Sequence, residues 1–349
     1  SWPPEGPSQR GCGGSWRVSE HADQGALRLR VDVLFLALAD SLPPISGRLH
    51  LGGVLGEGKN GSIREVADTE APAVACVAKS TAKARHSCDL LLEAAALSRL
   101  CSCEGFPRLV GLFRDEDVEV LVIGRLSRDL ESLRLDPAVC PSGQFSPATI
   151  VEVGTQVISR LQAMHERGLV HCDVKPKNLM IGPSASTIHL VDFGLCRPYR
   201  IGELHVTPPD TVRSIGTTRF CAIPAHSGER SPRSDLETLA YVLIYMAVGV
   251  LPWQGGEGNS KRERAKRMLE HKLQAALLEC HVRERLGGDA AGEALAEALV
   301  GLSAACRGLE AAVQPDYEGL LEILAHGLPP SAQQGDLDAP THRLDWLAL

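Results

Sequence analysis

Two short segments near the middle of the chain constrain its fold and chemistry most strongly. The first is His-Cys-Asp-Val-Lys-Pro-Lys-Asn at residues 171–178, and the second is Asp-Phe-Gly at residues 192–194, which follows an apolar run. Phosphoryl transfer from a nucleotide requires a carboxylate that faces the attacking hydroxyl, together with an amide and a second carboxylate that hold the metal ions. Asp173, Asn178 and Asp192 supply these groups in the required order. The two segments therefore predict a fold that brings them together around a metal-bound nucleotide.

Bulk properties argue against several other classes of protein. The chain has 349 residues, 44% of them hydrophobic, which is enough for one large or two ordinary domains. Its net charge of -7 gives no overall attraction to nucleic acid or anionic lipid, so we expect neither as a partner. The 11 cysteines are scattered, and the closest pair, Cys101 and Cys103, lacks a second pair at the spacing of a zinc site. Reduced thiols of this kind are typical of a cytoplasmic or nuclear protein.

One apolar run near the start of the chain does not predict a membrane span. Residues 33–39 are too few to cross a bilayer and are bracketed by Asp32 and Asp40. Arg28 and Arg30 precede the run as in a signal peptide, but the run lies far into the chain and lacks a clear cleavage site. We therefore expect neither secretion nor membrane insertion.

The composition divides the chain into a tail and two lobes. Residues 1–46 are rich in proline and glycine and are expected to be irregular or disordered. Residues 47–126 contain short apolar strands and one helix, which is typical of a small sheet-rich lobe. Residues 127–346 have mainly helical periodicity. This organisation predicts an α+β fold in which a cleft separates two lobes joined near residues 124–126.

The spacing of apolar residues predicts the individual elements of both lobes. In the first lobe we expect strands at 48–55, 63–67, 73–79, 109–113 and 118–123, and a helix at 84–100. In the second lobe we expect helices at 148–167, 234–250, 261–284, 289–313 and 316–326. The helix at 234–250 is apolar nearly all round, which indicates a buried central helix.

A glycine-rich sequence follows the first strand. Gly56, Gly58 and Gly61 form a G-x-G-x-x-G pattern, in which glycine allows the backbone to approach phosphate oxygens closely. A dinucleotide-binding fold would require a helix directly after the glycines, but residues 62–66 have the pattern of a strand. The sequence therefore predicts a hairpin that covers the phosphates of a nucleotide. Two apolar neighbours belong to the predicted nucleotide site: Leu55 and Ile63.

A lysine at the end of the strand at 73–79 is placed to reach the same phosphates. Lys79 can contact the α and β phosphates if a carboxylate holds its amine in place. Glu93, fourteen residues on and within the predicted helix, is the expected partner, and Asp89 is the alternative. If Glu93 were instead a solvated helical residue, this ion pair would not form.

The segment around Asp173 completes the predicted chemistry. Asp173 would orient the acceptor hydroxyl and accept its proton, while Lys175 would place positive charge beside the transferred phosphate. Asn178 and Asp192 would bind Mg²⁺, which prefers oxygen ligands. His171 is expected to pack and to form hydrogen bonds rather than to act as a base.

Further motifs extend through the second lobe. They are Val-Asp-Phe-Gly-Leu at 191–195, Gly-Thr-Thr-Arg-Phe at 216–220, Asp-Leu-Glu-Thr-Leu at 235–239, Tyr-Val-Leu-Ile-Tyr at 241–245, Leu-Pro-Trp-Gln-Gly at 251–255, Pro-Asp-Tyr at 315–317 and Asp-Trp at 345–346. Over residues 47–346 the chain resembles the casein kinase I superfamily, which includes the tau-tubulin and vaccinia-related kinases. The resemblance implies a bilobal protein-kinase-like fold and a serine/threonine protein kinase that uses ATP and Mg²⁺. Lys175, two residues after the catalytic aspartate, is typical of serine/threonine rather than tyrosine kinases.

The resemblance also implies roles for single residues. Thr217 would bond the catalytic aspartate and lysine and shape the acceptor site, and Asp235 would hold the catalytic loop through backbone N–H groups. Ile123 would lie at the back of the adenine pocket, and Leu126 on the hinge whose backbone bonds adenine. Most kinases carry Ala-Pro-Glu after the acceptor loop, but this chain has Cys-Ala-Ile-Pro-Ala-His at 221–226, and the loss of that glutamate is typical of this group.

Two features bear on regulation and on the choice of substrate. Cys172 replaces an arginine that usually pairs with a phosphate on the activation loop, so we expect activity without that phosphate. The superfamily favours acceptors preceded by acidic or phosphorylated residues. An anion site is expected at Arg219, Arg213, Lys261 and Arg262, because guanidinium groups bind phosphate with paired hydrogen bonds. Residues 261–267 can also be interpreted as a solvated helix face or as a nuclear-import signal.

We therefore expect a monomer that phosphorylates proteins at acidic or phosphorylated segments. Two alternatives remain. A catalytically weak pseudokinase scaffold would usually lack the strand lysine, the catalytic aspartate or a metal ligand, and this chain has all three. A small-molecule kinase of the aminoglycoside or choline type would lack Thr217 and the Pro-Trp-Gln-Gly sequence.

Overall fold

The computed structural model describes residues 45, 47–58, 61–70, 75–114, 118–202, 204–206, 214–255, 260–328 and 344–347. The chain divides into two units, residues 1–40 and 41–349, and every described residue belongs to the second unit. The tail predicted at 1–46 lies outside the described residues except for Ile45. Ile45 is buried together with Leu49 against the first lobe.

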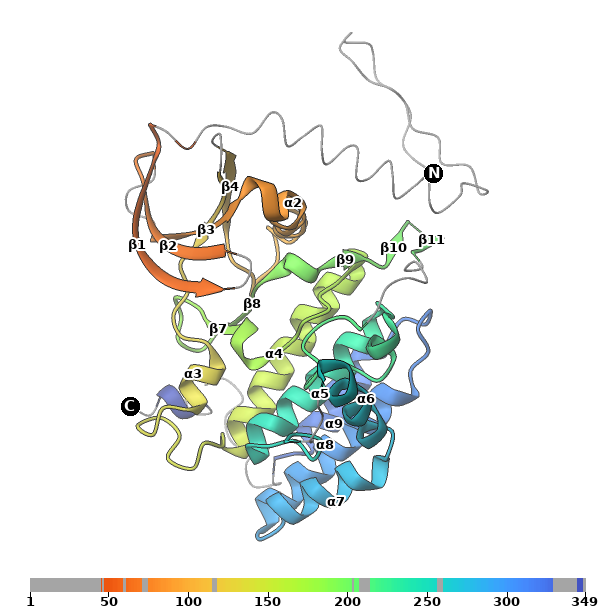
Figure 1. The fold of residues 1–349 in the computed structure, drawn as a ribbon. Helices are drawn as coiled ribbons and strands as arrows, with labels where there is room; N and C mark the ends of the chain where they lie inside the picture. Colours follow the sequence, from red (N-terminus) through yellow and green to blue (C-terminus); the bar gives the residue numbers. More distant parts are fainter. Residues whose placement is uncertain are drawn as a thin grey trace. The chain divides into compact units, whose positions relative to one another are not determined.

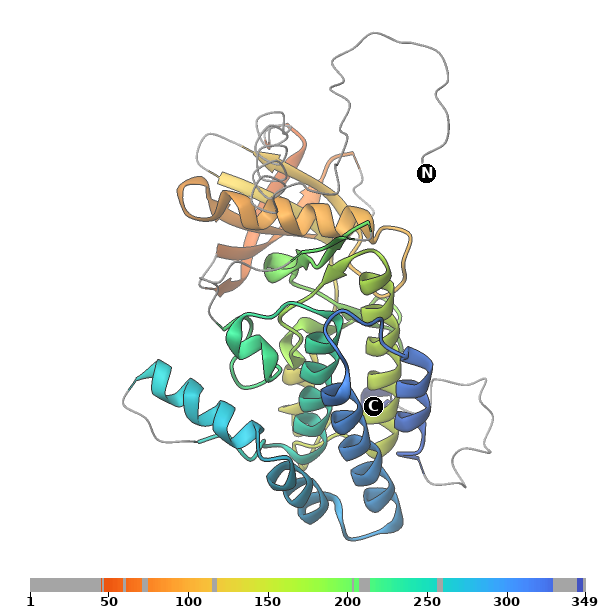
Figure 2. The same ribbon diagram turned by 90° about the vertical axis from the view of Figure 1, so that its right-hand side faces the viewer.

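The first lobe is built on a five-stranded antiparallel sheet with the strand order β1-β2-β3-β5-β4. The strands are β1 (Leu49–Gly58), β2 (Gly61–Asp68), β3 (Cys76–Ala82), β4 (Leu109–Arg114) and β5 (Val118–Gly124). Helix α2 (Lys83–Arg99) follows β3 and packs across the sheet (Figures 1 and 2), burying Leu90 and Ala94 against Leu112 and Leu121. This packing fixes α2, and hence any side chain on its inner face, relative to β3.

The second lobe is mainly helical. Its helices are α3 (Leu130–Arg134), α4 (Pro147–Glu166), α5 (Pro232–Val248), α6 (Lys261–Lys272), α7 (Ala275–Leu286), α8 (Ala290–Gly308) and α9 (Tyr317–Ala325). Short strands are β6 (Leu169–Val170), β7 (Leu179–Ile181), β8 (Ile188–Leu190), β9 (Arg197–Pro198), β10 (Arg200–Ile201) and β11 (Leu204–His205). Single 3-10 turns are η1 (Pro176–Asn178), η2 (Phe193–Leu195), η3 (Pro224–Ser227) and η5 (Asp345–Leu347).

Helix α5 is the centre of this lobe, as its sequence predicts. Pro232 occupies the first turn, where its missing N–H is not needed, and Gly249 ends the helix with a φ of 80°. Every residue of α5 except Arg233 is buried, and α4, α7 and α8 pack around it. The apolar surface that α5 removes from water makes this helix the platform on which the loops of the site are held.

The predicted elements of the first lobe agree with the structure to within three residues at their ends. The single helix predicted at 261–284 is wrong, because the structure has α6 and α7 with a break after Lys272. Arg307 Nη2 donates a hydrogen bond of 2.8 Å to the carbonyl of Lys272, which a continuous helix would use for the amide four residues later. The sequence around this break contains no proline or glycine, so its pattern predicts one continuous helix.

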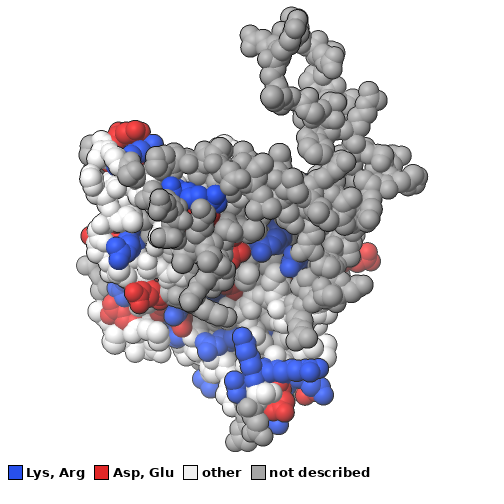
Figure 3. Space-filling view, turned by 45° about the horizontal axis from the view of Figure 1, so that its top comes forward, with Lys and Arg blue, Asp and Glu red and all other residues white. Residues whose placement is uncertain are grey.

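In the described part of the chain, no helix combines the length and the apolar character needed to cross a bilayer. The face drawn in Figure 3 carries charges of both signs, with Lys and Arg side chains gathered in its lower part.

Candidate active site

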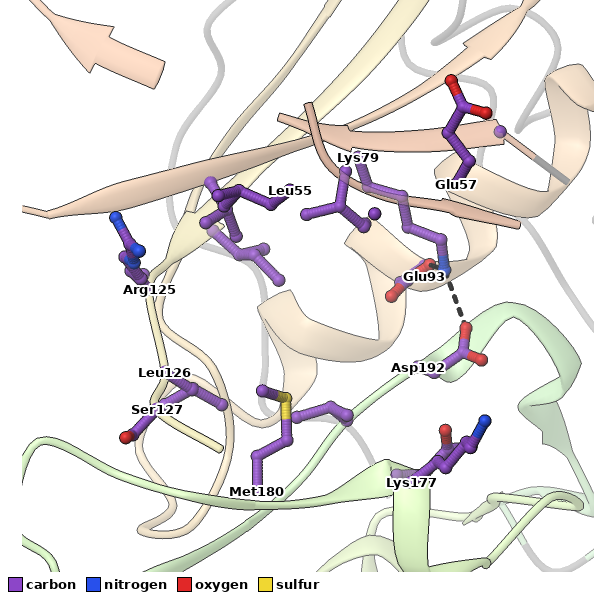
Figure 4. Close-up of a pocket in the computed structure, with 18 of the residues that line it drawn as sticks. Leu55, Glu57, Lys79, Glu93, Arg125, Leu126, Ser127, Lys177, Met180 and Asp192 are labelled. Atoms are coloured by element: carbon purple, nitrogen blue, oxygen red, sulfur yellow. Dashed lines mark hydrogen bonds and ion pairs between the residues drawn. The ribbon is translucent and has the colours of Figure 1, made fainter. Parts of the chain in front are cut away.

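A cavity of about 750 Å³ lies between the sheet and the helical lobe, beside the segment that joins β5 to α3 (Figure 4). Its wall consists of Leu55, Gly56, Glu57, Gly61, Ile63, Val77, Lys79, Glu93, Ile123, Gly124, Arg125, Leu126, Ser127, Lys175, Lys177, Asn178, Met180, Val191 and Asp192. One side of this wall comes from the sheet and α2, and the other from the loops between β6 and η2. The two halves of the predicted site therefore meet at one cavity.

The hairpin between β1 and β2 forms the upper wall. Gly61 has a φ of 146°, and a Cβ there would lie only 2.0 Å from the carbonyl oxygen of Ser80 on β3. This position therefore requires glycine, because any side chain would push the hairpin away from the sheet. Gly58 pairs with Gly61 at the end of the hairpin, while Lys59 and Asn60 of the predicted loop lie outside the described residues.

Lys79 is the central cation of the cavity. It lies on β3 between Ile63 and Leu121, and its side chain points down from the sheet toward the second lobe (Figure 4). Its Nζ is 2.7 Å from Glu93 Oε2 and 2.7 Å from Asp192 Oδ1. Lys79 thus links β3, α2 and the Asp-Phe-Gly segment, and Glu93 is the partner that the sequence predicts.

The pKa values in this cluster follow from burial and from the three charges. Burial alone would lower the pKa of Lys79, but the two carboxylates outweigh it and raise that pKa above its ordinary value. Burial alone would raise the pKa of Asp192, but the charge and hydrogen bond of Lys79 hold that pKa below its usual range. For Glu93 burial dominates, so its pKa is raised even beside Lys79. Lys79 therefore favours the ionised form of Asp192.

Asp173 lies just behind the cavity wall and is held from three directions. Its Oδ2 is 2.5 Å from Lys175 Nζ, and its Oδ1 accepts hydrogen bonds from the backbone N–H (2.8 Å) and the hydroxyl (2.7 Å) of Thr217. Gly216 makes this approach feasible, since a Cβ there would lie 2.4 Å from the carbonyl oxygen of Cys172. Asp173 is buried, with 7% of the residue exposed, and donors on both sides hold its two carboxylate oxygens.

The loop that carries Asp173 is supported from below by a second buried carboxylate. Asp235 on α5 accepts hydrogen bonds from the backbone N–H groups of His171 (2.7 Å) and Cys172 (2.9 Å). Its Oδ2 also lies 3.1 Å from Nε2 of His165. Cys172 has a φ of 68°, a left-handed conformation that costs free energy in a residue with a side chain. Asp235 therefore holds a strained turn directly before Asp173.

Two oxygens of the cavity are suited to a divalent cation. Asn178 uses its Nδ2 to donate to the carbonyl of Asp173 (2.9 Å), which leaves Oδ1 as its acceptor atom. Asp192 uses Oδ1 for Lys79, and its side chain is 43% exposed, so Oδ2 remains accessible. An ionised carboxylate and an amide oxygen are the ligand types that Mg²⁺ prefers. The residues present therefore fit a metal bound to the phosphates of a nucleotide.

The wall contains every predicted nucleotide residue except Gly58: Leu55, Gly56, Gly61, Ile63, Lys79, Glu93, Ile123 and Leu126. Of the predicted catalytic residues, Lys175 and Asn178 line the wall, and Asp173 and Thr217 are joined to it through Lys175. Arg213 of the expected anion site lies outside the described residues.

Sequence reasoning missed several residues of the wall, among them Val77, Met180 and Val191. Val77 carried a signal, because it lies two residues before Lys79 on the same strand and must face the same side. Met180 lies two residues after Asn178 on β7, but that strand has only three residues, too few for a clear alternation. Its place opposite the sheet is visible only in the assembled lobes (Figure 4).

The comparison with known protein families agrees with this geometry. A family model described as protein kinase domain matches residues 49–294, well over half of the chain. The matched range includes the glycine-rich hairpin, the strand lysine, and the segments that contain Asp173 and Asp192.

Proposed function

Since the chain belongs to the protein kinase family, we propose that it is a serine/threonine protein kinase of the casein kinase I type that uses ATP with Mg²⁺. The observation that carries this proposal is the triad at Asp173, where Lys175 and Thr217 hold the two carboxylate oxygens. The lysine two residues after the aspartate is the feature that favours hydroxyls of serine and threonine over tyrosine. We further propose that the protein acts as a monomer in the cytoplasm or nucleus.

Each side chain of the site has a role in this reaction. Asp173 orients the acceptor hydroxyl and takes its proton as the phosphoryl group is transferred. Lys175 and Lys79 supply positive charge, the first beside the transferred group and the second beside the α and β phosphates. Asn178 and Asp192 would hold the metal, which neutralises charge on the phosphates when it is bound. The alternative of a pseudokinase scaffold is disfavoured because the Lys79–Glu93 and Lys79–Asp192 ion pairs are both intact.

The arginine after the acceptor loop supports a preference for acidic or phosphorylated substrates. The Arg219 guanidinium lies over the rings of Phe220 (5.6 Å) and Tyr245 (5.7 Å). The backbone carbonyl of Arg219 accepts a hydrogen bond from Trp253 Nε1 (2.8 Å). This stacking fixes the orientation of the guanidinium, and Arg219 lies two positions after Thr217 in the sequence. Exposed basic residues at the start of α6 add positive charge: Lys261 and Arg262.

Phosphorylation of casein, followed by identification of the modified residues, tests the proposed function. We expect phosphoserine and phosphothreonine, and we expect activity from protein shown by mass spectrometry to carry no phosphate between residues 195 and 217. A peptide with a phosphoserine before the acceptor should be a better substrate than its unphosphorylated form. Phosphotyrosine as the main product, or no transfer at all, would contradict the proposal.

Arg219→Gln should raise the KM for the phosphorylated peptide about tenfold, because the variant loses a hydrogen bond to a charged group worth about 1.5 kcal/mol. The KM for ATP should stay unchanged. Arg283→Gln is the matched control, since Arg283 is an exposed arginine on α7 paired with Glu279. Equal effects of the two substitutions on the peptide KM would remove Arg219 from the anion site.

Glu93→Gln should lower kcat/KM for ATP about 100-fold, since an error of about 1 Å in the position of a catalytic group can cost that much. The neutral amide no longer anchors Lys79, which then follows Asp192 alone. Steady-state kinetics with varied ATP measure the effect, and Glu279→Gln on the exposed face of α7 serves as control. An unchanged kcat/KM would show that Asp192 by itself positions the lysine.

A further inference from the structure

A fully buried lysine lies behind the acceptor loop, outside the cavity described above. Lys272 is the last residue of α6 and is 0% exposed. Its Nζ donates hydrogen bonds to the carbonyl oxygens of Thr218 (2.8 Å) and Cys221 (2.6 Å), and it lies 3.2 Å from Nε2 of His226. Lysines are almost never fully buried, and those that are have partners for their charge, so the contacts of this ammonium bear on its role.

Among the described residues, the ammonium of Lys272 contacts backbone carbonyl oxygens, His226, the Cys221 thiol and two aromatic rings, and no carboxylate is bonded to it directly. The ammonium lies 5.3 Å from the ring centroid of Trp253 and 5.5 Å from that of Tyr241, within the range of cation–π attraction. Glu237, whose charge acts on Lys272, is itself bonded to the hydroxyl of Tyr241 and to the N–H of Ile223, and it lies 3.8 Å from Arg307. Burying a cation without a carboxylate bonded directly to it costs free energy, even where carbonyl oxygens accept its hydrogen bonds. The burial of a cation here therefore points to a task for its charge.

Lys272 holds the segment at 217–221, which also contacts Asp173. Thr217 bonds Asp173 through its N–H and hydroxyl, and the carbonyl of Thr217 accepts from the N–H groups of Phe220 (2.8 Å) and Cys221 (2.9 Å). Residues 217–221 thus form a turn fixed by Asp173 on one side and by Lys272 on the other. A change at Lys272 reaches the catalytic carboxylate through this one turn.

We propose that Lys272 is a positioning residue for the protein acceptor, and that its ammonium charge holds the turn at 217–221 in register with Asp173. The inference rests on the proposed kinase function and adds the residue that couples α6 to the acceptor site. Lys272 is fully buried and does not line the cavity, so its loss should affect the use of the protein substrate and leave nucleotide affinity unchanged.

The charge of Lys272 should depend on pH within an accessible range. Burial is the main cause that lowers the pKa of Lys272 from its ordinary value of 10.5 to about 8, since Cys221 and Glu237 offset it only in part and the charge of Arg307 adds to it. Burial and the charge of Lys272 lower the pKa of His226 to about 4. Burial also raises the pKa values of Cys221 and Tyr241 above their ordinary values. Among these titrating neighbours, Lys272 is the group that changes charge between pH 7 and 9.

Activity and stability should respond to this titration in opposite directions. The unfolded chain keeps the proton of Lys272 up to about 10.5, whereas the folded protein releases it near 8. Because the unfolded state binds more protons in this window, the contribution of Lys272 to the free energy of unfolding increases with pH. If Lys272 served stability alone, activity should not fall as the pH rises from 7 to 9. If Lys272 positions the acceptor, activity should fall over this range while the protein stays folded.

The experiment measures kcat/KM for a protein acceptor, the Kd of ATP and the urea midpoint of unfolding at pH 7, 8 and 9. For the wild type, kcat/KM should fall about tenfold between pH 7 and 9, as the protonated fraction of a group with a pKa of 8 does. Lys272→Met should start about tenfold lower at pH 7 and show no fall in this range. Lys266→Met should retain the wild-type profile, because Lys266 is an exposed lysine of the same helix.

The outcomes separate this inference from the proposed function. A wild type that transfers no phosphate at pH 7 overturns the kinase proposal and this inference with it. A wild type that is active, together with a Lys272→Met variant of equal activity or with the same alkaline fall, overturns the role of Lys272 alone. If Lys272→Met does not fold, the wild-type profile still decides, since a fall in kcat/KM that coincides with a falling urea midpoint contradicts positioning.

Discussion

Asp173→Asn should lower kcat for protein phosphorylation by about 100- to 10,000-fold, the range that general acid–base groups contribute. In the proposed reaction this carboxylate receives the proton of the acceptor hydroxyl, and an amide cannot receive it. The geometry adds a second effect. Oδ2 lies 2.5 Å from the ammonium of Lys175, so the amide nitrogen of the variant either opposes that donor or turns toward Thr217. Both orientations put two donors face to face.

Nucleotide affinity should distinguish this loss from a general collapse of the site. Lys79, Asn178 and Asp192 remain unchanged in the variant, so the Kd of ATP should stay within about twofold of the wild type. Asp316→Asn is the matched control, because Asp316 caps α9 through the N–H of Gly319, and asparagine caps a helix as well as aspartate does. Transfer to casein that persists at the wild-type rate would show that Asp173 does not act in the chemical step.

The parts of the site that the sequence predicts are those encoded by short, local patterns. Lys79 near the end of an apolar strand and Glu93 fourteen residues later, within the predicted helix, lie close together in the sequence, and their order predicts the ion pair. Residues fixed by distant packing were not predictable in this way. Lys272 is buried by the turn at 217–221 and by Arg307 of α8, which are distant in the sequence. The basic residues at 261–267 of the same helix indicate a solvated face and do not predict a buried lysine.

The same distinction applies to the elements of the fold. Helix α5 is identified from sequence because it is apolar on all sides, so its burial does not depend on knowing its neighbours. The end of α6 is not identified, because it is set by a hydrogen bond between residues 35 positions apart. The spacing of apolar residues shows which face of a helix or strand is buried. The residue at which an element ends can depend on a contact with another element, which the local sequence does not contain.

Asp235→Asn should lower the free energy of unfolding by about 3 kcal/mol, since a buried donor that loses its partner costs 1–3 kcal/mol and hydrogen bonds to a charged group are lost as well. Both carboxylate oxygens accept from N–H groups, Oδ2 from His171 and Oδ1 from Cys172. An amide can satisfy only one of them and directs its own donors at the other. Urea titration measures the change, with Asp289→Asn at the N-cap of α8 as a control that should be nearly neutral.

The strained backbone at Cys172 gives this prediction a sharper test. If Asp235 acts by holding the left-handed turn, then Cys172→Gly in the Asp235→Asn background should restore about 1 kcal/mol, because glycine adopts a φ of 68° without the steric cost. The double variant should also regain part of the lost kcat, since Asp173 is the next residue. A double variant no more stable than Asp235→Asn would mean that Asp235 acts through His165 and the packing of α4 on α5, and that the turn before Asp173 holds its shape unaided.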